Sequence, residues 1–481
     1  MITPRFSCSQ NDRSVIVSVY CPAVRASEIE IHVDHALLSL HVAPYFLRLN
    51  FPASVVEDNR SSAVYDPASG YLTLTLTKLN PGVVFPDLDL LGKLLAPPAQ
   101  GRPRNPTIEV LGSGDNPGYT ADLGATERNE ILEAAANEWT FPQTASDTLP
   151  VLETSLRKPY GFLNAYSGYF LHVGTTENEV NELGADAETL SPSERRIRRL
   201  RHEDSKWNPE HYMADYADNE QMEELLAWTH PHLESPSTSV VFTEAENAAM
   251  LRLPRKEYLP SPQETHDLYL ALLTLLFAYA YDARTTLHDP TPESAWTIAA
   301  LTPAFSALDP PPYSPPHKRR GATVAHELEP VQPEPALDFG FDSGTPHELA
   351  TTLIPSYRRA LAFPLYRSWA LADGCRMDAA YFLIRGTRTV LRCLLELRAI
   401  LEGHEVYYVY SRIWLDDFCR WIQAGAREDT LIRLGKIVSH LGISKDSIGW
   451  DLVVLEHAVQ TTKESKPDSD DDVESEKPAL L

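Results

Sequence analysis

The spacing of the apolar residues changes once along this chain, and that change limits the folds it can adopt. Up to about residue 96 apolar and polar residues alternate, as in the run of Val15, Val17 and Val19. A period of two predicts strands that bury one face. Beyond about residue 151 the apolar residues recur every three or four positions, which predicts helices. Since one core rarely serves 481 residues, we expect a multi-domain protein in which an all-α domain follows an all-β domain.

Proline-rich stretches and turn residues divide these two parts further. Closely spaced turn residues separate short strands in residues 1–96, a pattern typical of an antiparallel sandwich of roughly seven strands. Residues 97–150 are expected to be a mostly flexible linker before a helical domain at 151–460. Within that domain the stretch 302–346 is expected to be a disordered insertion. We interpret 461–481 as an acidic disordered tail.

The formal net charge of -25 limits the kinds of partner that the protein can bind. A field of this sign repels phosphate, so we expect a basic protein as the partner and no stable binding of nucleic acid. The five cysteines lie far apart, which predicts neither a disulfide framework nor a zinc site and indicates a reducing compartment, the nucleus or the cytoplasm. The longest apolar stretch, Leu268–Tyr281, is about half of what a bilayer requires. It predicts a buried core helix, and we expect no membrane attachment.

An arginine-dense segment opens the helical part of the chain. Five arginines lie between Arg195 and Arg201, and Ser193 is expected to cap their helix. One interpretation is a solvated helix whose arginines pair with Glu194, Glu203 and Asp204 across one turn. The other is a patch that binds RNA by releasing counterions from phosphate.

A series of short motifs gives the chain a family resemblance. The motifs are, in order, Pro44–Leu49, Val64–Asp66, Gly70–Leu74, Tyr160–Phe162, Ser167–Phe170, Ala280–Arg284, Glu293–Thr297, Pro364–Trp369 and Asp417–Ile422. In this order they resemble the Shq family, the assembly chaperones of box H/ACA ribonucleoproteins. The resemblance implies a CS domain, an α-crystallin-like sandwich, in residues 1–96 and a Shq-specific all-α domain in 151–460.

The resemblance also implies a function in binding, without catalysis. Shq proteins bind the newly made dyskerin-type pseudouridine synthase and occupy its RNA-binding surface as a placeholder until guide RNA and core proteins assemble. We therefore expect a protein that is not an enzyme, needs no cofactor and is monomeric when free. An acidic chain suits this role, because it can cover a basic surface. The alternative is a client adaptor of an ATP-driven heat-shock chaperone that works through the CS domain.

Aromatic and arginine side chains are the candidates for partner contacts. Tyr366, Arg367 and Trp369 belong to the residue types that dominate the energetics of interfaces. Packing in the core is the competing interpretation for each of them. The pair Tyr212 and Tyr216, in the helix after the arginine-dense one, is the alternative place for the contact.

The remaining motifs predict little chemistry. His230–His232 places two imidazoles close together, but no further ligand lies near in the sequence, so we interpret them as a loop pair and predict no metal site. Cys375, Cys393 and Cys419 lie among leucines and aromatic residues and are expected to be buried thiols. Ser469 precedes three aspartates and is a candidate for phosphorylation.

Overall fold

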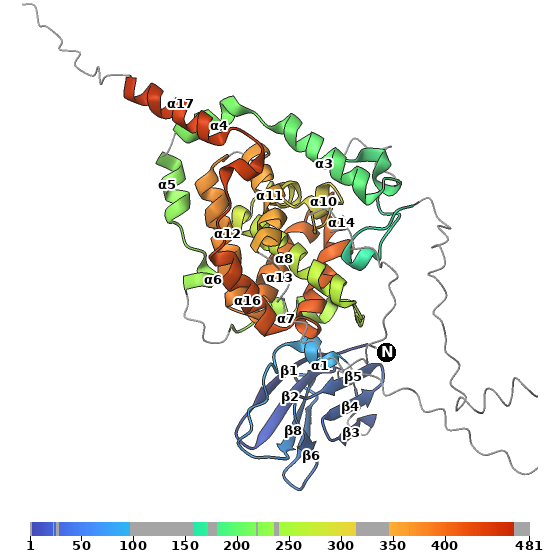
Figure 1. The fold of residues 1–481 in the computed structure, drawn as a ribbon. Coiled ribbons are helices and arrows are strands. Elements are labelled where there is room, and N and C mark those ends of the chain that lie inside the picture. The colour runs from blue at the N-terminus through green and yellow to red at the C-terminus, as the bar shows by residue number, and fades with distance from the viewer. Residues whose placement is uncertain are drawn as a thin grey trace, which may run out of the picture. The chain divides into compact units, whose positions relative to one another are not determined.

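The computed structural model describes residues 2–22, 24–25, 28–96, 157–171, 180–217, 220–234, 240–313, 346–364 and 366–465. Antiparallel strands fill the first part and helices the rest, which confirms the predicted fold class (Figure 1). The strands are β1 (Arg5–Gln10), β2 (Ser14–Tyr20), β3 (Glu30–Asp34), β4 (Leu37–Val42), β5 (Tyr45–Asn50), β6 (Val55–Val56), β7 (Ser62–Asp66) and β8 (Tyr71–Lys78).

Helices of widely differing length make up the remainder. Those before the arginine-dense segment are α1 (Leu91–Leu95), η2 (Phe162–Asn164) and η4 (Gly184–Glu188). Those up to the insertion are α3 (Pro192–Lys206), α4 (Pro209–Ala217), α5 (Glu220–Ala227), α6 (Pro231–Glu234), α7 (Glu244–Arg252), α8 (Pro262–Thr285), α9 (Ser294–Leu301) and α10 (Pro303–Ser306). The last group is α11 (Pro346–Ala362), α12 (Trp369–Ile384), α13 (Thr387–Glu402), α14 (Tyr408–Tyr410), η5 (Ser411–Leu415), α15 (Asp416–Ala424), α16 (Glu428–Ser439), η6 (Lys445–Ile448) and α17 (Leu452–Ser465).

Two antiparallel sheets form the N-terminal sandwich. One has the order β1-β2-β8-β6 with β7 also paired to β8, and the other has the order β3-β4-β5. Val17 lies opposite Leu74 in the β2–β8 register, and both side chains are buried. The alternating residues thus face the core between the sheets, as their period of two predicts. The described residues form eight strands, one more than the rough expectation, because Val55–Val56 add a short strand beside β8.

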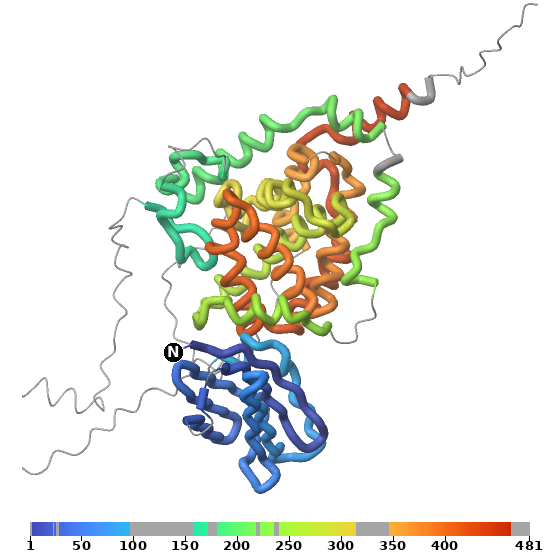
Figure 2. Tube along the Cα trace, turned by 180° about the vertical axis from the view of Figure 1, so that it is seen from behind, coloured from blue at the N-terminus to red at the C-terminus, as the bar shows by residue number. Residues whose placement is uncertain are grey.

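Helix α8 forms the centre of the helical domain. Its residues from Leu268 to Arg284 are all buried, and it packs against α9, α11, α12 and α13 (Figure 2). This confirms the prediction of a buried core helix at Leu268–Tyr281. None of the helices in the described ranges is both long and apolar enough to cross a bilayer.

The structure corrects three predicted boundaries. Residues 302–313 do not belong to the insertion, since they form α10 and a buried segment in which Phe305 is fully enclosed. Ser191, not Ser193, caps α3: its side chain accepts from the amide of Glu194, and the Glu194 carboxylate accepts from the amide of Ser191. Proline at the first helical position moves this start two residues upstream. Helix α17 extends to Ser465, so the tail begins later than residue 461. The linker at 97–150 lies outside the described residues.

The segment that closes the sandwich also contacts the helical domain. The described residues on either side of 97–156 form one compact unit. The amide of Gly92 in α1 donates to Oε1 of Gln423 in α15 at 2.8 Å. A Cβ at position 92 would lie 2.1 Å from that oxygen, so a larger residue would displace the Gln423 side chain and break this hydrogen bond. Asp89, just before α1, accepts two hydrogen bonds from the guanidinium of Arg388 in α13.

A buried group of opposite charges joins α3 to α11. The carboxylate of Glu203 is fully enclosed and accepts from Arg199 at 2.8 Å, from Arg358 at 2.7 Å and from Arg359 at 3.1 Å. Arg199 also donates to Asp309 at 2.7 Å, which ties in the segment after α10. Every charge in this group has a partner of opposite sign, as burial requires.

The interpretation of α3 as a solvated helix is therefore wrong for part of its arginines. Arg195 and Arg199 are each only 2% exposed. Arg195 donates to the backbone carbonyls of Pro159, Lys158 and Ala187 at 3.0–3.1 Å. Polar residues on a helix lie in the interior here because other segments of the chain supply their partners. The helical period alone does not reveal those segments.

Replacing Glu203 with alanine is expected to lower the free energy of unfolding by about 3–5 kcal/mol, because three buried guanidinium groups lose their shared anion. Urea unfolding followed by circular dichroism measures this loss. The matched control is Asp186→Ala. It removes the carboxylate of an exposed ion pair with Arg198, which lies on α3 like Glu203. That change should cost about 1 kcal/mol or less. Equal losses for the two variants would contradict the assignment of Glu203 as the buried anion.

Candidate partner-binding site

The two predicted places for the partner contact meet in the folded chain. The backbone amide and the guanidinium of Arg367 both donate to Oδ2 of Asp215, at 3.0 and 3.2 Å. Asp215 lies on α4 beside Tyr216, and α4 packs along α17 in both views of the fold (Figures 1 and 2). We call the region formed by α4, α17, Trp450 and residues 366–369 the α4 surface. From the sequence, α4 and residues 366–369 were alternative places for the partner contact.

The tyrosines of α4 differ in what they do. Tyr212 is 1% exposed, and its hydroxyl donates to Glu456 of α17 at 2.7 Å. Burial and this carboxylate raise the pKa of Tyr212, so the hydroxyl keeps its proton. The Tyr216 ring is only half buried, and its hydroxyl accepts from the amide group of Gln460 at 2.8 Å. Tyr212 therefore fixes α4 on α17, while Tyr216 keeps an accessible edge.

Residues 366–369 divide in the same way. The ring of Trp369 packs 5.0 Å from that of Tyr357 in α11, and the ring of Tyr366 is half buried against the helical core. The Tyr366 carbonyl accepts from the hydroxyl of Tyr281 at 2.7 Å, which holds this segment on α8. Trp369 thus follows the core interpretation for most of its surface. The ring of Tyr366 and the side chain of Arg367 reach the surface in part.

A stacked tryptophan pair extends the α4 surface and was not found from the sequence. The ring centroids of Trp207 and Trp450 lie 4.2 Å apart, the angle between the ring planes is 8°, and both residues are partly exposed. The guanidinium of Arg358 lies 4.3 Å from the Trp450 ring. Val453 and Val454 of α17, which follow Trp450 closely in the sequence, are 54% and 67% exposed. Exposed apolar groups on one surface are typical of a protein-binding site.

The stretch of sequence that forms α4 and α5 is negatively charged. From Trp207 to Glu234 the sequence has seven acidic residues and no lysine or arginine. Glu210, Glu223 and Glu224 of this stretch are exposed. An acidic surface with aromatic side chains complements a basic protein surface.

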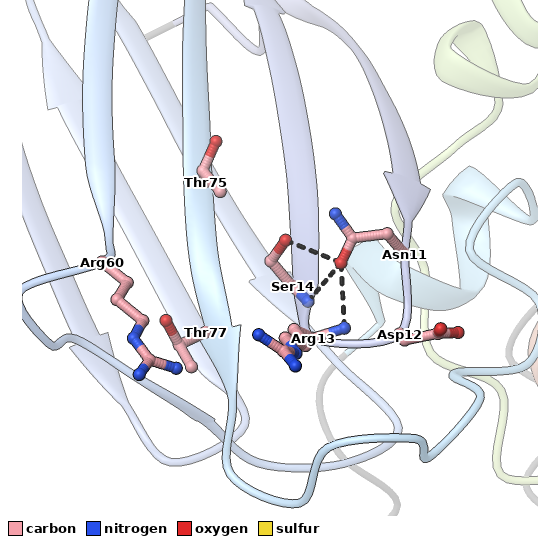
Figure 3. A pocket seen from close by; sticks show the side chains of 7 residues that line it. All are labelled: Asn11, Asp12, Arg13, Ser14, Arg60, Thr75 and Thr77. Carbon is pink, nitrogen blue, oxygen red and sulfur yellow. Dashed lines mark hydrogen bonds between the residues drawn. The ribbon is translucent and has the colours of Figure 1, made fainter.

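A pocket of opposite character lies on the sandwich. It has a volume of about 470 Å³, and its lining residues are Asn11, Asp12, Arg13, Ser14, Arg60, Thr75 and Thr77 (Figure 3). Oδ1 of Asn11 accepts from the amides of Arg13 and Ser14 and so shapes the β1–β2 turn at the rim. Among the described residues neither Arg13 nor Arg60 pairs its guanidinium with a carboxylate. This pocket suits an acidic ligand.

Comparison with known proteins identifies the family. The family model of the SHQ1 protein, Shq1 domain, matches residues 232–452, and that of the SHQ1-like CS domain matches residues 3–95. Protein shq1 of Schizosaccharomyces pombe is 34% identical over 478 residues, which cover 96% of this chain and 97% of the relative. The chain belongs to the Shq1 family. Shq1 homologues from Xenopus tropicalis and Mus musculus are 30% and 28% identical, over 97% of this chain and 71% and 76% of their own lengths.

Membership makes this chain a Shq1-type protein, one of a family of chaperone-type assembly factors. The two family models fall on the sandwich and on the helical domain, in the order that the resemblance implied. Helix α4 lies before the residues that the Shq1 model matches, and α17 begins where the match ends. Ser469 lies outside the described residues, so its role as a phosphorylation site stays a prediction.

Asp215→Ala is expected to lower the free energy of unfolding by about 1–3 kcal/mol, because the amide and guanidinium of Arg367 lose a charged acceptor that is 25% exposed. Urea titration measures the change. Glu210→Ala, on an exposed position of the same helix, is the control and should stay within about 0.5 kcal/mol of the unmodified protein. If both variants match the unmodified protein, α4 and residues 366–369 do not depend on this pair.

Proposed function

We propose that this Shq1-type protein binds a newly made dyskerin-type pseudouridine synthase and occupies its RNA-binding surface until guide RNA and core proteins assemble. The observation that carries the proposal is the α4 surface, which combines acidic charge with exposed aromatic and apolar groups. A surface that binds RNA must be basic, and the α4 surface offers it carboxylates in place of phosphates. The net charge of -25 would also speed the encounter with such a partner. Nucleus and cytoplasm remain the proposed compartments.

The alternative of direct RNA binding through α3 loses its support. Arg195 and Arg199 are buried, Arg196 donates to Asp309 at 3.2 Å, and Arg198 donates to Asp186 at 2.7 Å. Four of the five arginines between 195 and 201 thus bind groups of the protein itself. Their charge is compensated within the fold, which leaves little to release counterions from phosphate.

A second candidate function rests on the sandwich. The pocket with Arg13 and Arg60 would suit an acidic segment of a heat-shock chaperone, and the chain would then act as a client adaptor through its CS domain. The two candidates place the essential contact on surfaces of opposite charge. Charge reversal on each surface separates them.

If the protein is a placeholder, it and guide RNA should exclude each other on the synthase. Adding H/ACA guide RNA to a preformed protein–synthase complex, and the protein to a synthase–RNA complex, tests this on a native gel. We expect two binary complexes whose proportions follow the concentrations of the competitors. A stable ternary complex in which RNA is seated normally would contradict the proposal.

The double change Glu223→Lys and Glu224→Lys reverses exposed charge on α5, the helix that follows α4 in the chain. We expect it to weaken binding of the synthase by roughly tenfold, or about 1.4 kcal/mol, and the loss should shrink as salt is raised. Titration calorimetry at two salt concentrations measures both effects. The matched control is Arg13→Glu with Arg60→Glu, which should leave synthase binding unchanged. A loss in the control alone would place the synthase contact on the sandwich instead of the α4 surface.

A further inference from the structure

Three histidines and one carboxylate from separate parts of the sequence lie together in the helical domain. His230 precedes α6, His232 lies on α6, His288 follows α8, and Glu396 lies on α13. The ligand nitrogens of the three rings all lie within 4.8 Å of one another. From the sequence we interpreted His230–His232 as a loop pair, because the third imidazole and the carboxylate lie 56 or more positions away. Folding brings all four together.

Both oxygens of Glu396 face imidazole nitrogens. Nε2 of His232 lies 2.7 Å from Oε1, and Nε2 of His288 lies 2.9 Å from Oε2. The side chains of His232, His288 and Glu396 are 14%, 27% and 28% exposed, so solutes can reach the nitrogens and the carboxylate. Two imidazoles and a carboxylate that converge from three separate elements are a ligand set that zinc-class ions prefer.

The fifth group of the cluster is Tyr279, on the buried side. Its hydroxyl donates to Oε2 of Glu396 and accepts from Nε2 of His230 at 3.1 Å. Nδ1 of His230 accepts from the backbone amide of His232 at 3.1 Å, so it carries no proton, and the proton of the neutral ring is on Nε2. Coordination through that nitrogen would remove the ring's last proton. His230 is therefore a positioning residue that orients Tyr279, and through it Glu396.

The backbone is also arranged to present His288. Leu287 and His288 both have left-handed backbone conformations, with φ of 54° and 64°. Residues other than glycine adopt this region at an energetic cost, and two in succession are uncommon. The amide of His288 donates to the carbonyl of Ala283 at 2.8 Å, which closes the end of α8 in this form. The result directs the ring at Glu396 instead of into solvent.

We propose that this cluster binds one divalent transition-metal ion of the zinc class, with His232, His288 and Glu396 as ligands and His230 and Tyr279 as positioning residues. Tetrahedral zinc with bonds near 2.0–2.1 Å needs ligand atoms about 3.3 Å apart. The nitrogen–oxygen separations of 2.7 and 2.9 Å must open by a few tenths of an ångström once the ion replaces the Nε2 protons. Neutral rings then hold their proton on Nδ1. The bound ion would join α6 to α8 and α13.

The test is metal uptake by the full-length protein after treatment with a chelator. We expect one equivalent of Zn²⁺ to bind in chelator competition and to raise the melting temperature. Co²⁺ should give the visible absorption of a four- or five-coordinate nitrogen and oxygen site. His288→Gln and Glu396→Gln should each lower the affinity at least about 100-fold, and Tyr279→Phe about 10-fold. The control is His266→Gln, which alters a similarly exposed histidine–glutamate pair with Glu348 and should keep full affinity.

Three results would overturn the proposal. The first is no stoichiometric uptake of zinc or cobalt by the folded protein. The second is unchanged affinity in both His288→Gln and Glu396→Gln. The third is a thiolate charge-transfer band in the cobalt spectrum, which would place the ion at a cysteine, for example Cys393 in α13. The cobalt spectrum of the unmodified protein and the Tyr279→Phe variant decide the matter even if a ligand variant fails to fold.

Discussion

The helical domain depends on a single buried carboxylate. Glu203 accepts hydrogen bonds from three arginines, one on its own helix and two on α11, without any exposure to solvent. Because Glu203 and these guanidinium groups are buried, removing the shared carboxylate would leave charges without their closest partner. The group thereby fixes α3 against α11 and sets where the chain turns into α4. The α4 surface, which follows directly, takes its position from this arrangement.

Charge compensation within the fold also explains why an arginine-dense helix occurs in an acidic protein. The guanidinium groups of α3 bind carbonyls and carboxylates of the fold, such as Asp309 after α10. Of the acidic residues that follow, Asp215 in α4 binds Arg367, whereas Glu223 and Glu224 in α5 are exposed. Most of the positive charge of α3 is therefore compensated within the fold, while α5 exposes negative charge. This division supports a basic protein as the partner, because the displayed surface is the one that an approaching molecule meets first.

The helical domain contains two regions of different chemistry, which the proposals treat independently. The α4 surface has exposed aromatic, apolar and acidic groups, and it supports the binding of a large partner. The histidine cluster is small, is built from α6, the end of α8 and α13, and supports a metal ion. Within the described ranges its residues share no hydrogen bond with Asp215 or Tyr366. Failure of one proposal therefore leaves the other standing.

The sequence by itself determined the fold class, the core helix at Leu268–Tyr281 and the family, because these depend on local period and on motifs in a fixed order. It also named Tyr366, Arg367, Tyr212 and Tyr216, yet it could not show that Asp215 joins them. Only the tertiary structure decided which polar residues are buried, and why Trp207 meets Trp450. It alone brought His288 and Glu396 to His232. The burial of paired charges and the meeting of the histidines with Glu396 depend on contacts between segments that are distant in the sequence. The spacing of residues along one helix does not predict such contacts.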